Sequence, residues 1–214
     1  NPPPRIAETP SGMLNAVGLQ NPGVDHFLKE DLPWLRQQGM VVIANIAGNT
    51  PEEYCSMAEK LSDSDVDMVE LNISCPNVKQ GGVQFGTSCA GVEGITSQVR
   101  RFCKKPLMVK LSPNVADIGE IAAAAEAAGA DVVSLINTLT GMRIDIESRR
   151  PIIRNNTGGM SGPAVFHVAV RMVWQVAQRV KIPVVGLGGI STWQDAVEML
   201  LAGADALQIG TVFF

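Results

Sequence analysis

Six short apolar runs that alternate with stretches of helical spacing constrain the fold of this chain more than any other feature of its sequence. The runs are Val41–Ala47, Met68–Ser74, Leu107–Leu111, Val132–Asn137, Val184–Leu187 and Ala206–Ile209. The helical stretches are Val24–Gln38, Pro51–Leu61, Val92–Cys103, Asp117–Ala128, Val165–Arg179 and Trp193–Ala202. Continuous apolar runs between amphipathic helices are typical of parallel strands that helices cover. The pattern therefore predicts an α/β fold.

Two joints between a helical stretch and an apolar run repeat each other. The sequence AGAD occupies positions 128–131 before one run and positions 202–205 before another. Each glycine suits the left-handed backbone position just past a helix end. The repetition favours one βα unit used many times, and hence a TIM (β/α)8 barrel, although an open doubly wound sheet has the same alternation. Six units are present, where a barrel has eight.

Two segments lack this alternation of apolar runs and helical stretches. Residues Asn1–Gly23 contain five prolines and little helical or strand periodicity, so we expect an ordered loop region there. The glycine-rich segment Thr157–Pro163 is expected to be a flexible loop that opens a helix.

Composition limits the class of protein. Hydrophobic residues make up 46% and charged residues 18% of the 214 residues, which excludes a disordered chain because such chains have too little apolar surface to bury. The formal charge of −4 argues against a nucleic-acid partner. No apolar run approaches the roughly 18 residues of a membrane span. The four cysteines form no CxxC pair and no signal peptide opens the chain, so we expect reduced thiols in a cytoplasmic protein.

Asparagine ends three of the predicted strands, at Asn45, Asn72 and Asn137, although it is depleted in strands generally. Barrel enzymes build their sites at the carboxyl ends of strands. An amide both donates and accepts hydrogen bonds, so converging amides can hold a planar ligand rich in carbonyl and N–H groups. The alternative for each asparagine is that it caps a helix or shapes a turn.

Lys110 lies inside an apolar run, and lysine is seldom buried without a partner. It is interpreted either as a fixed cation that faces an anionic or electron-accepting ring, or as a side chain that extends from the strand end to water. Glycine-rich turns follow the last two predicted strands, at residues 186–189 (GLGG) and at residues 210–211 (GT). Barrels commonly bind phosphate at this place, so the turns predict a phosphate-bearing cofactor, although glycine also serves ordinary tight turns.

Cys75 follows a predicted strand end and stands between Asn72 and Asn77. A free cysteine is more often a small buried hydrophobe, which is our interpretation of Cys55 and Cys103. A thiol at position 75 could instead act as a nucleophile or a proton acceptor.

Other polar residues are given structural interpretations. His26 and His167 fall on separate predicted helices, which makes a cysteine–histidine dyad or a histidine metal site a poor interpretation. The acidic residues Asp63, Asp65 and Asp67 are interpreted as a solvated turn.

At residues 70–82 (ELNISCPNVKQGG) the chain resembles the class 1 dihydroorotate dehydrogenases, most closely the catalytic subunit of the NAD-linked subclass B. Supporting stretches are Asn1–Gly23, Val109–Asn114, Ile136–Thr138, Asn156–Ala164, Gly186–Ser191 and Ile209–Thr211. The resemblance spans essentially the whole chain, with its motifs in family order. It implies a single FMN-binding TIM barrel domain over residues 1–214 that oxidises (S)-dihydroorotate to orotate in pyrimidine (UMP) synthesis.

The resemblance also implies roles for individual residues. Cys75 matches the base that takes the C5 proton while hydride leaves C6 for the flavin. The substrate-binding residues that it implies are Asn15, Ala16, Val17, Gly18, Leu19, Asn72, Asn77, Asn137 and Thr138. The FMN-binding residues that it implies are Asn45, Asn72, Lys110, Ile136, Gly162, Gly188, Gly189, Gly210 and Thr211, with no metal.

In subclass B, electrons pass from FMN to a separate subunit that carries FAD and a [2Fe–2S] cluster, and then to NAD. No cysteine cluster in this sequence could hold the [2Fe–2S] centre, so that centre must belong to a partner subunit. The resemblance implies that the chain forms a homodimer, which joins the electron-transfer subunit in a heterotetramer. Residues 78–82 resemble subclass B rather than the fumarate-reducing subclass A. The alternatives are that fumarate-linked enzyme, a flavin barrel of the dihydropyrimidine dehydrogenase type, and a non-catalytic barrel scaffold subunit.

The length of the chain is short for the family. Family members carry two strands before the segment that Asn1–Arg5 matches and a closing helix after the one that Ile209–Thr211 matches. A barrel typically needs about 250 residues. We therefore expect an incomplete or truncated chain that lacks the first two strands and the C-terminal helix.

Overall fold

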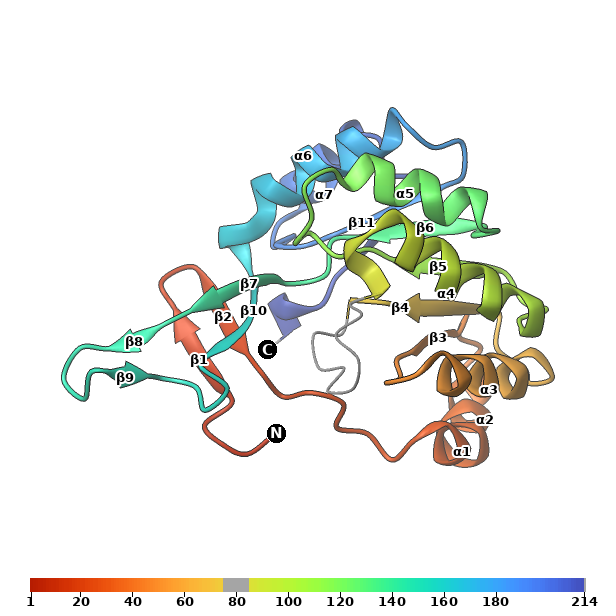
Figure 1. The fold of residues 1–214 in the computed structure, drawn as a ribbon, viewed down its shortest axis with the longest axis horizontal. Helices are drawn as coiled ribbons and strands as arrows, with labels where there is room; N and C mark the ends of the chain where they lie inside the picture. The colour runs from red at the N-terminus through yellow and green to blue at the C-terminus, as the bar shows by residue number, and fades with distance from the viewer. Residues whose placement is uncertain (75–84, 214) are drawn as a thin grey trace.

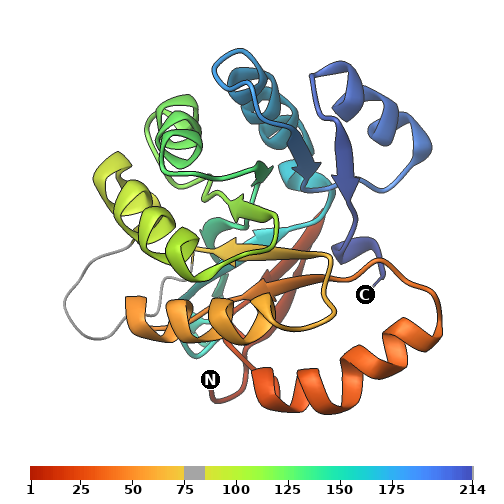
Figure 2. The same cartoon turned by 90° about the vertical axis from the view of Figure 1, so that its right-hand side faces the viewer.

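The computed structural model describes residues 1–74 and 85–213, and its ribbon is drawn from two directions in Figures 1 and 2. At its centre is a parallel six-stranded sheet with the order β12-β11-β6-β5-β4-β3. The strands are β3 (Ile43–Ile46), β4 (Met68–Asn72), β5 (Leu107–Lys110), β6 (Val132–Leu135), β11 (Val184–Leu187) and β12 (Ala206–Gln208). Each strand lies within one of the six apolar runs, so the predicted α/β fold with parallel strands is confirmed.

Helices cover one face of this sheet, and Figure 2 shows the sheet curled inside them like half of a barrel. They are α3 (Pro51–Ser62), α4 (Cys89–Phe102), α5 (Ile118–Ala127), α6 (Phe166–Ala177) and α7 (Trp193–Leu201). The α4 helix begins earlier than its apolar spacing predicts because the Ser88 side chain caps it by accepting a hydrogen bond from Gly91 N. The first predicted helix is divided into α1 (Val24–His26) and α2 (Leu32–Gln37), which flank a π-helical turn.

Three aspartates tie neighbouring strands of the sheet together at their amino ends. Asp67, Asp131 and Asp205 each stand one residue before a strand, and their carboxylates accept hydrogen bonds of 2.7, 2.8 and 2.8 Å from a backbone N–H at the start of the adjacent strand. The glycines of the two AGAD joints have φ values of 98° and 110°, as expected for residues past a helix end. The repeated joint therefore ends a helix and also aligns two strands.

Asp63 and Asp65 are exposed in the turn between α3 and β4, as expected, and the exposed Asp67 that follows them has a structural role in addition. Its Oδ2 lies 2.8 Å from Arg36 Nη1 and accepts the hydrogen bond from Val42 N. The bond from the Arg36 guanidinium, followed by the bond from Val42, lowers the pKa of Asp67 below its usual range. The carboxylate thereby holds α2 against the start of β3.

A second, antiparallel sheet stands at the carboxyl ends of the parallel strands (Figure 1). Its order is β1-β2-β10-β7, with β1 (Ile6–Thr9), β2 (Gly12–Asn15), β7 (Leu139–Met142) and β10 (Thr157–Ser161), and the hairpin β8 (Ile144–Asp145) and β9 (Arg150–Pro151) extends from it. The loop predictions for Asn1–Gly23 and Thr157–Pro163 are therefore wrong over these strands. The predictions failed because β2 pairs with β10, which is distant from it in the sequence. The conformation of each segment is therefore decided by its partner strand and not by local periodicity.

The two faces of the parallel sheet differ in chemistry. Val69, Leu71 and Val109 are fully buried in the core between the sheet and its helices. The alternate residues of the same strands, including Glu70 and Lys110, face the inside of the curled sheet and line a cavity there. Among residues 1–74 and 85–213, no helix has the length and apolar character that crossing a membrane requires.

Candidate active site

A cavity of about 970 Å³ opens at the carboxyl ends of the parallel strands, beneath the antiparallel sheet. Many residues that the sequence singled out line it, namely Lys110, Ile136, Asn137, Thr138, Gly162, Gly188, Gly189, Gly210 and Thr211. Residues of the β1–β2 hairpin, among them Thr9 and Met13, line it from the other side. The volume falls in the range of sites that enclose small molecules and cofactors. The structure thus brings seven of the nine expected cofactor-binding residues to one cavity, whereas Asn45 and Asn72 do not line it.

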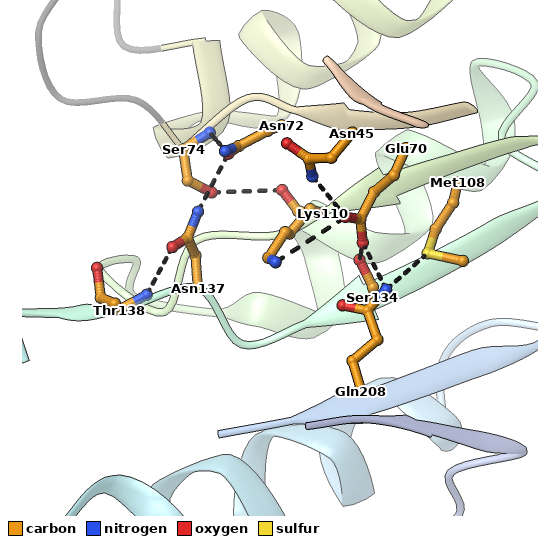
Figure 3. A network of polar contacts seen from close by, with 10 residues as sticks. All are labelled: Asn45, Glu70, Asn72, Ser74, Met108, Lys110, Ser134, Asn137, Thr138 and Gln208. Atoms are coloured by element: carbon orange, nitrogen blue, oxygen red, sulfur yellow. Dashed lines mark hydrogen bonds and ion pairs between the residues drawn. The ribbon is translucent and has the colours of Figure 1, made fainter. Parts of the chain in front are cut away.

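Lys110 points into this cavity and does not extend to bulk water, so the alternative of a solvent-directed lysine is wrong. Its side chain is 18% exposed and its Nζ lies 3.9 Å from Glu70 Oε2. Glu70 itself is buried, and its Oε1 accepts hydrogen bonds from Ser134 Oγ at 2.7 Å and Gln208 Nε2 at 3.0 Å. Asn45 Nδ2 donates to Glu70 Oε2 at 2.5 Å (Figure 3). Lys110 is therefore a largely buried cation at the cavity wall, beside a buried carboxylate.

The other two asparagines meet at the ends of β4 and β6, as Figure 3 shows. Asn137 Nδ2 donates to Asn72 Oδ1 at 3.1 Å. The same Asn72 oxygen accepts from Ser74 N at 3.2 Å, and Asn137 Oδ1 accepts from Thr138 N at 2.8 Å. The turn-shaping alternative is thus also true of both residues. Each amide holds its own strand end while the pair converges beside Lys110.

A smaller pocket of about 270 Å³ adjoins the first, and Thr138 lines both. Asn15 and Ala16 reach it from β2 and the residue after it, and Ser74 reaches it from beyond β4. Its wall also contains Asn114, whose Nδ2 donates to Thr138 O at 3.1 Å and whose Oδ1 accepts from Thr140 N at 2.9 Å. The pocket is therefore walled by hydroxyl and amide groups, which suits a small polar ligand.

Glycines form one wall of the large cavity because no side chain fits there. Gly162, Gly188 and Gly189 have φ values of 98°, 122° and 76°, which L side chains rarely adopt. A Cβ at Gly189 would lie 2.7 Å from Gly162 O, so these turns also pack tightly against each other. By contrast, a Cβ at Gly210 would meet nothing within 4 Å, and the structure offers no steric reason for that glycine.

Several expected site residues lie elsewhere. Val17, Gly18, Leu19, Asn45 and Asn72 line neither cavity, and Leu19 is 51% exposed. The Asn1 side chain donates to Ala16 O at 2.7 Å and holds this stretch from outside. Cys75 and Asn77 lie outside the described residues.

Glu70, Ser134 and Gln208 are polar residues of the site that sequence reasoning missed. The signal for Glu70 was present, since a carboxylate interrupts the apolar run Met68–Ser74 at its centre. Gln208 and Ser134 carry no such signal, because a single neutral polar residue in a strand is common. Thr9 also lines the large cavity, and its buried Oγ1 has no hydrogen-bond partner among residues 1–74 and 85–213.

The remaining cysteines and histidines lie in the helical layer. Burial raises the pKa of the Cys103 thiol, and burial also raises that of Cys55, which suits packing roles rather than catalysis. His26 ends α1 with its Nδ1 3.6 Å from Asp31 Oδ2. His167 lies on α6, where its ring meets that of Phe166 edge to face.

Comparison with known proteins gives matches over the whole chain. The family model for dihydroorotate dehydrogenase matches residues 1–214. The chain is 58% identical over 214 residues to the dihydroorotate dehydrogenase B (NAD(+)) catalytic subunit of Alkaliphilus oremlandii, and 60% identical over 214 residues to that of Alkaliphilus metalliredigens. It is 54% identical over 214 residues to the protein of the same name from Thermoanaerobacter pseudethanolicus. Each match covers 100% of this chain and 71% of the relative.

Proposed function

The chain belongs to the dihydroorotate dehydrogenase family, and we propose that it is a catalytic subunit that oxidises dihydroorotate to orotate in pyrimidine synthesis. The observation that carries the proposal is the large cavity at the strand ends, which joins a fixed cation at Lys110 to a wall of glycine turns. The family's fold is a TIM barrel, and the curled sheet of six parallel strands is the part of such a barrel seen here. Electrons pass to NAD through a partner subunit.

FMN is the proposed cofactor, and the cavity residues fit it. The volume of about 970 Å³ accommodates a ligand of that size. Gly188 and Gly189 line the cavity, and glycine turns of this kind supply the backbone N–H groups that hold a phosphate in other proteins. The unpaired hydroxyl of Thr9 is a further group that a bound ligand could satisfy. When bound, FMN supplies the acceptor for the hydride that leaves C6 of dihydroorotate.

The flavin ring is assigned to residues at the strand ends, and the ribityl chain with its phosphate is assigned to the glycine turns. Lys110 and Ile136, which line the cavity, are assigned to the ring together with Asn45 and Asn72 from the neighbouring strand ends, and the Lys110 ammonium favours negative charge placed beside it. The ribityl chain and the phosphate are assigned to Gly162, Gly188, Gly189, Gly210 and Thr211.

The substrate is assigned to the smaller pocket and the region where it joins the larger one. Orotate is planar, anionic and edged with amide groups, which suits the walls that Asn15, Asn137 and Thr138 supply. Asn72 orients Asn137, and the family resemblance adds Asn77 and the stretch Ala16–Leu19. Cys75 takes the proton from C5 of dihydroorotate and the hydride departs from C6, so the substrate loses a proton and a hydride as the C5–C6 double bond forms.

The assembly is proposed on the family resemblance. The chain forms one FMN-binding barrel domain, pairs with a second copy, and joins an electron-transfer subunit that carries FAD and a [2Fe–2S] cluster. We place this complex in the cytoplasm. The relatives' name, catalytic subunit, supports the existence of a partner.

The absorption spectrum of the purified protein tests the proposal. We expect a flavin band that added dihydroorotate bleaches under anaerobic conditions, and added fumarate should not restore it as fast as the partner subunit with NAD does. A protein without flavin, to which added FMN does not bind, would contradict the enzymatic proposal and favour a scaffold. A flavin band that dihydropyrimidines bleach but dihydroorotate does not would contradict the substrate.

A further inference from the structure

Glu70 is a buried carboxylate at which five strands of the parallel sheet meet. It stands on β4, is 4% exposed, and faces the interior of the curled sheet. Asn45 contacts it from β3, Lys110 from β5, Ser134 from β6 and Gln208 from β12 (Figure 3). A buried carboxylate needs partners of this kind because removal from water costs a charge much of its hydration energy.

The two oxygens of Glu70 have different surroundings. Oε1 accepts hydrogen bonds from two neutral donors, Ser134 Oγ at 2.7 Å and Gln208 Nε2 at 3.0 Å. Oε2 accepts one from Asn45 Nδ2 at 2.5 Å and lies 3.9 Å from Lys110 Nζ. The neutral donors therefore hold the carboxylate in place, and its charge attracts Lys110 at a distance longer than a hydrogen bond.

The contact with Glu70 holds the Lys110 ammonium group in place but does not use its hydrogen-bond donors. Its Nζ finds no hydrogen-bond acceptor among residues 1–74 and 85–213, and its side chain lines the large cavity. A Lys110 ammonium without Glu70 would carry a full positive charge at the cavity wall. With Glu70 beside it, part of that charge is offset in an interior where water screens little.

We propose that Glu70 is a positioning residue that holds the Lys110 ammonium at the cavity wall and, by offsetting its charge, sets the reduction potential of the flavin bound there. The proposal rests on the proposed function, since it requires a flavin in the cavity. Reduction brings negative charge into the cavity, which Lys110 favours and Glu70 opposes. Neutralising Glu70 therefore makes the flavin a stronger oxidant, whereas a purely structural Glu70 would leave the potential unchanged.

The substitution E70Q separates charge from shape. The side chain keeps its length, and its amide oxygen can stay at the Oε1 position between Ser134 and Gln208. Its NH₂ group then takes the Oε2 position, where the Asn45 amide turns over so that its oxygen accepts. The variant thus removes the charge that faces Lys110 while the hydrogen bonds are replaced.

The matched control is S134A, which removes a hydrogen bond to the same carboxylate and leaves its charge. The flavin midpoint potential is measured by reductive titration of each holoenzyme against a reference dye. For E70Q we expect a shift to a more positive potential that corresponds to at least about a tenfold change in the equilibrium constant, or about 30 mV for a two-electron couple. For S134A we expect a change of less than about threefold.

A potential of E70Q equal to that of the unsubstituted holoenzyme would overturn the proposal, and so would equal shifts in E70Q and S134A. If E70Q does not accumulate as folded protein, E70D replaces it. That variant keeps the charge but withdraws it from Lys110 by one methylene group, and a smaller shift in the same direction is expected. No shift in E70D would then overturn the proposal.

The unsubstituted holoenzyme separates this inference from the function on which it rests. If dihydroorotate fails to reduce its flavin, the proposed function is wrong. If dihydroorotate reduces it and the E70Q potential does not move, only the role of Glu70 is wrong.

Discussion

Gly159 of β10 limits the position of Thr138, and enlarging it tests the assignment of the substrate pocket. A Cβ at Gly159 would lie 2.6 Å from Thr138 Cβ and closer still to its hydroxyl oxygen. The backbone of Gly159 has no positive φ, so alanine fits its conformation, and the three atoms nearest to the added Cβ all belong to Thr138. To reach an ordinary contact of 3.4 Å or more, the Thr138 side chain must retreat by roughly 1 Å.

That retreat disturbs the polar wall of the smaller pocket. Thr138 N donates to Asn137 Oδ1, and Thr138 O accepts from Asn114, so a displaced residue 138 pulls on both amides. A misplacement of about 1 Å at a substrate-positioning group can cost about 100-fold in rate. We therefore expect G159A to lower the rate constant for flavin reduction by dihydroorotate by about 10- to 100-fold. The forced contact should also cost about 1–3 kcal/mol of unfolding free energy.

Stopped-flow measurement of flavin reduction, with flavin content and urea unfolding measured in parallel, checks this expectation. The control is G94A, the same substitution on α4, where the added Cβ meets nothing within 4 Å. G94A should react at the normal rate and gain up to about 1 kcal/mol of stability from helix propensity. A G159A protein with full flavin content and a rate within threefold of normal would refute the placement of Thr138 at the substrate. A rate loss of the same size in G94A would refute the steric reasoning.

Two further expectations concern protonation. The substitution C75A should abolish flavin reduction by dihydroorotate while FMN stays bound. In the unsubstituted protein, the rate of this reduction should rise between about pH 7 and pH 9, because a thiol with an ordinary pKa of about 8.5 is mostly protonated at neutral pH. A rate that does not change with pH, or loss of FMN from C75A, would contradict the role of Cys75 as the base. The bond from Arg36 lowers the pKa of Asp67, so its contribution to stability is complete above the ordinary aspartate pKa of about 3.9 and disappears as the pH falls through the lowered native value. D67N should accordingly be less stable than the unsubstituted protein in urea at pH 7, with a difference that narrows in acid, and a difference independent of pH would contradict the linkage.

The parallel half of the fold could be predicted because its signals are local. Each strand lies within an apolar run of the sequence, and each helix follows a periodicity of a few residues that its caps reinforce. The glycine past each helix end adopts the left-handed conformation that its sequence context requires, as the φ value of 98° at Gly129 shows. The carboxyl-end position of Asn72, Lys110 and Asn137 follows from the same pattern, because parallel strands place their ends at one edge.

The antiparallel sheet could not be predicted in this way. β2 contains a glycine and only one fully buried residue, Leu14, so it has no alternation to recognise. It is a strand because β1 and β10 pair with it on either side, and β10 lies more than 100 residues away in the sequence. This long-range pairing matters for function, because the antiparallel sheet forms the wall of the cavity that faces the strand ends.

The sequence by itself determined the order of the parallel strands and of the helices that cover them, the end of that sheet at which polar groups gather, and the family to which its motifs belong. These depend on neighbours within a few positions, where spacing and capping act directly. Only the tertiary structure decided which of those polar groups touch. Glu70 meets Ser134 and Gln208 although they are 64 and 138 residues distant, because the strand order β12-β11-β6-β5-β4-β3 and the curl of the sheet aim their side chains at one interior point. A buried charge is stabilised by whichever donors and cations the fold brings within a few ångströms of it, and distance along the chain does not specify them.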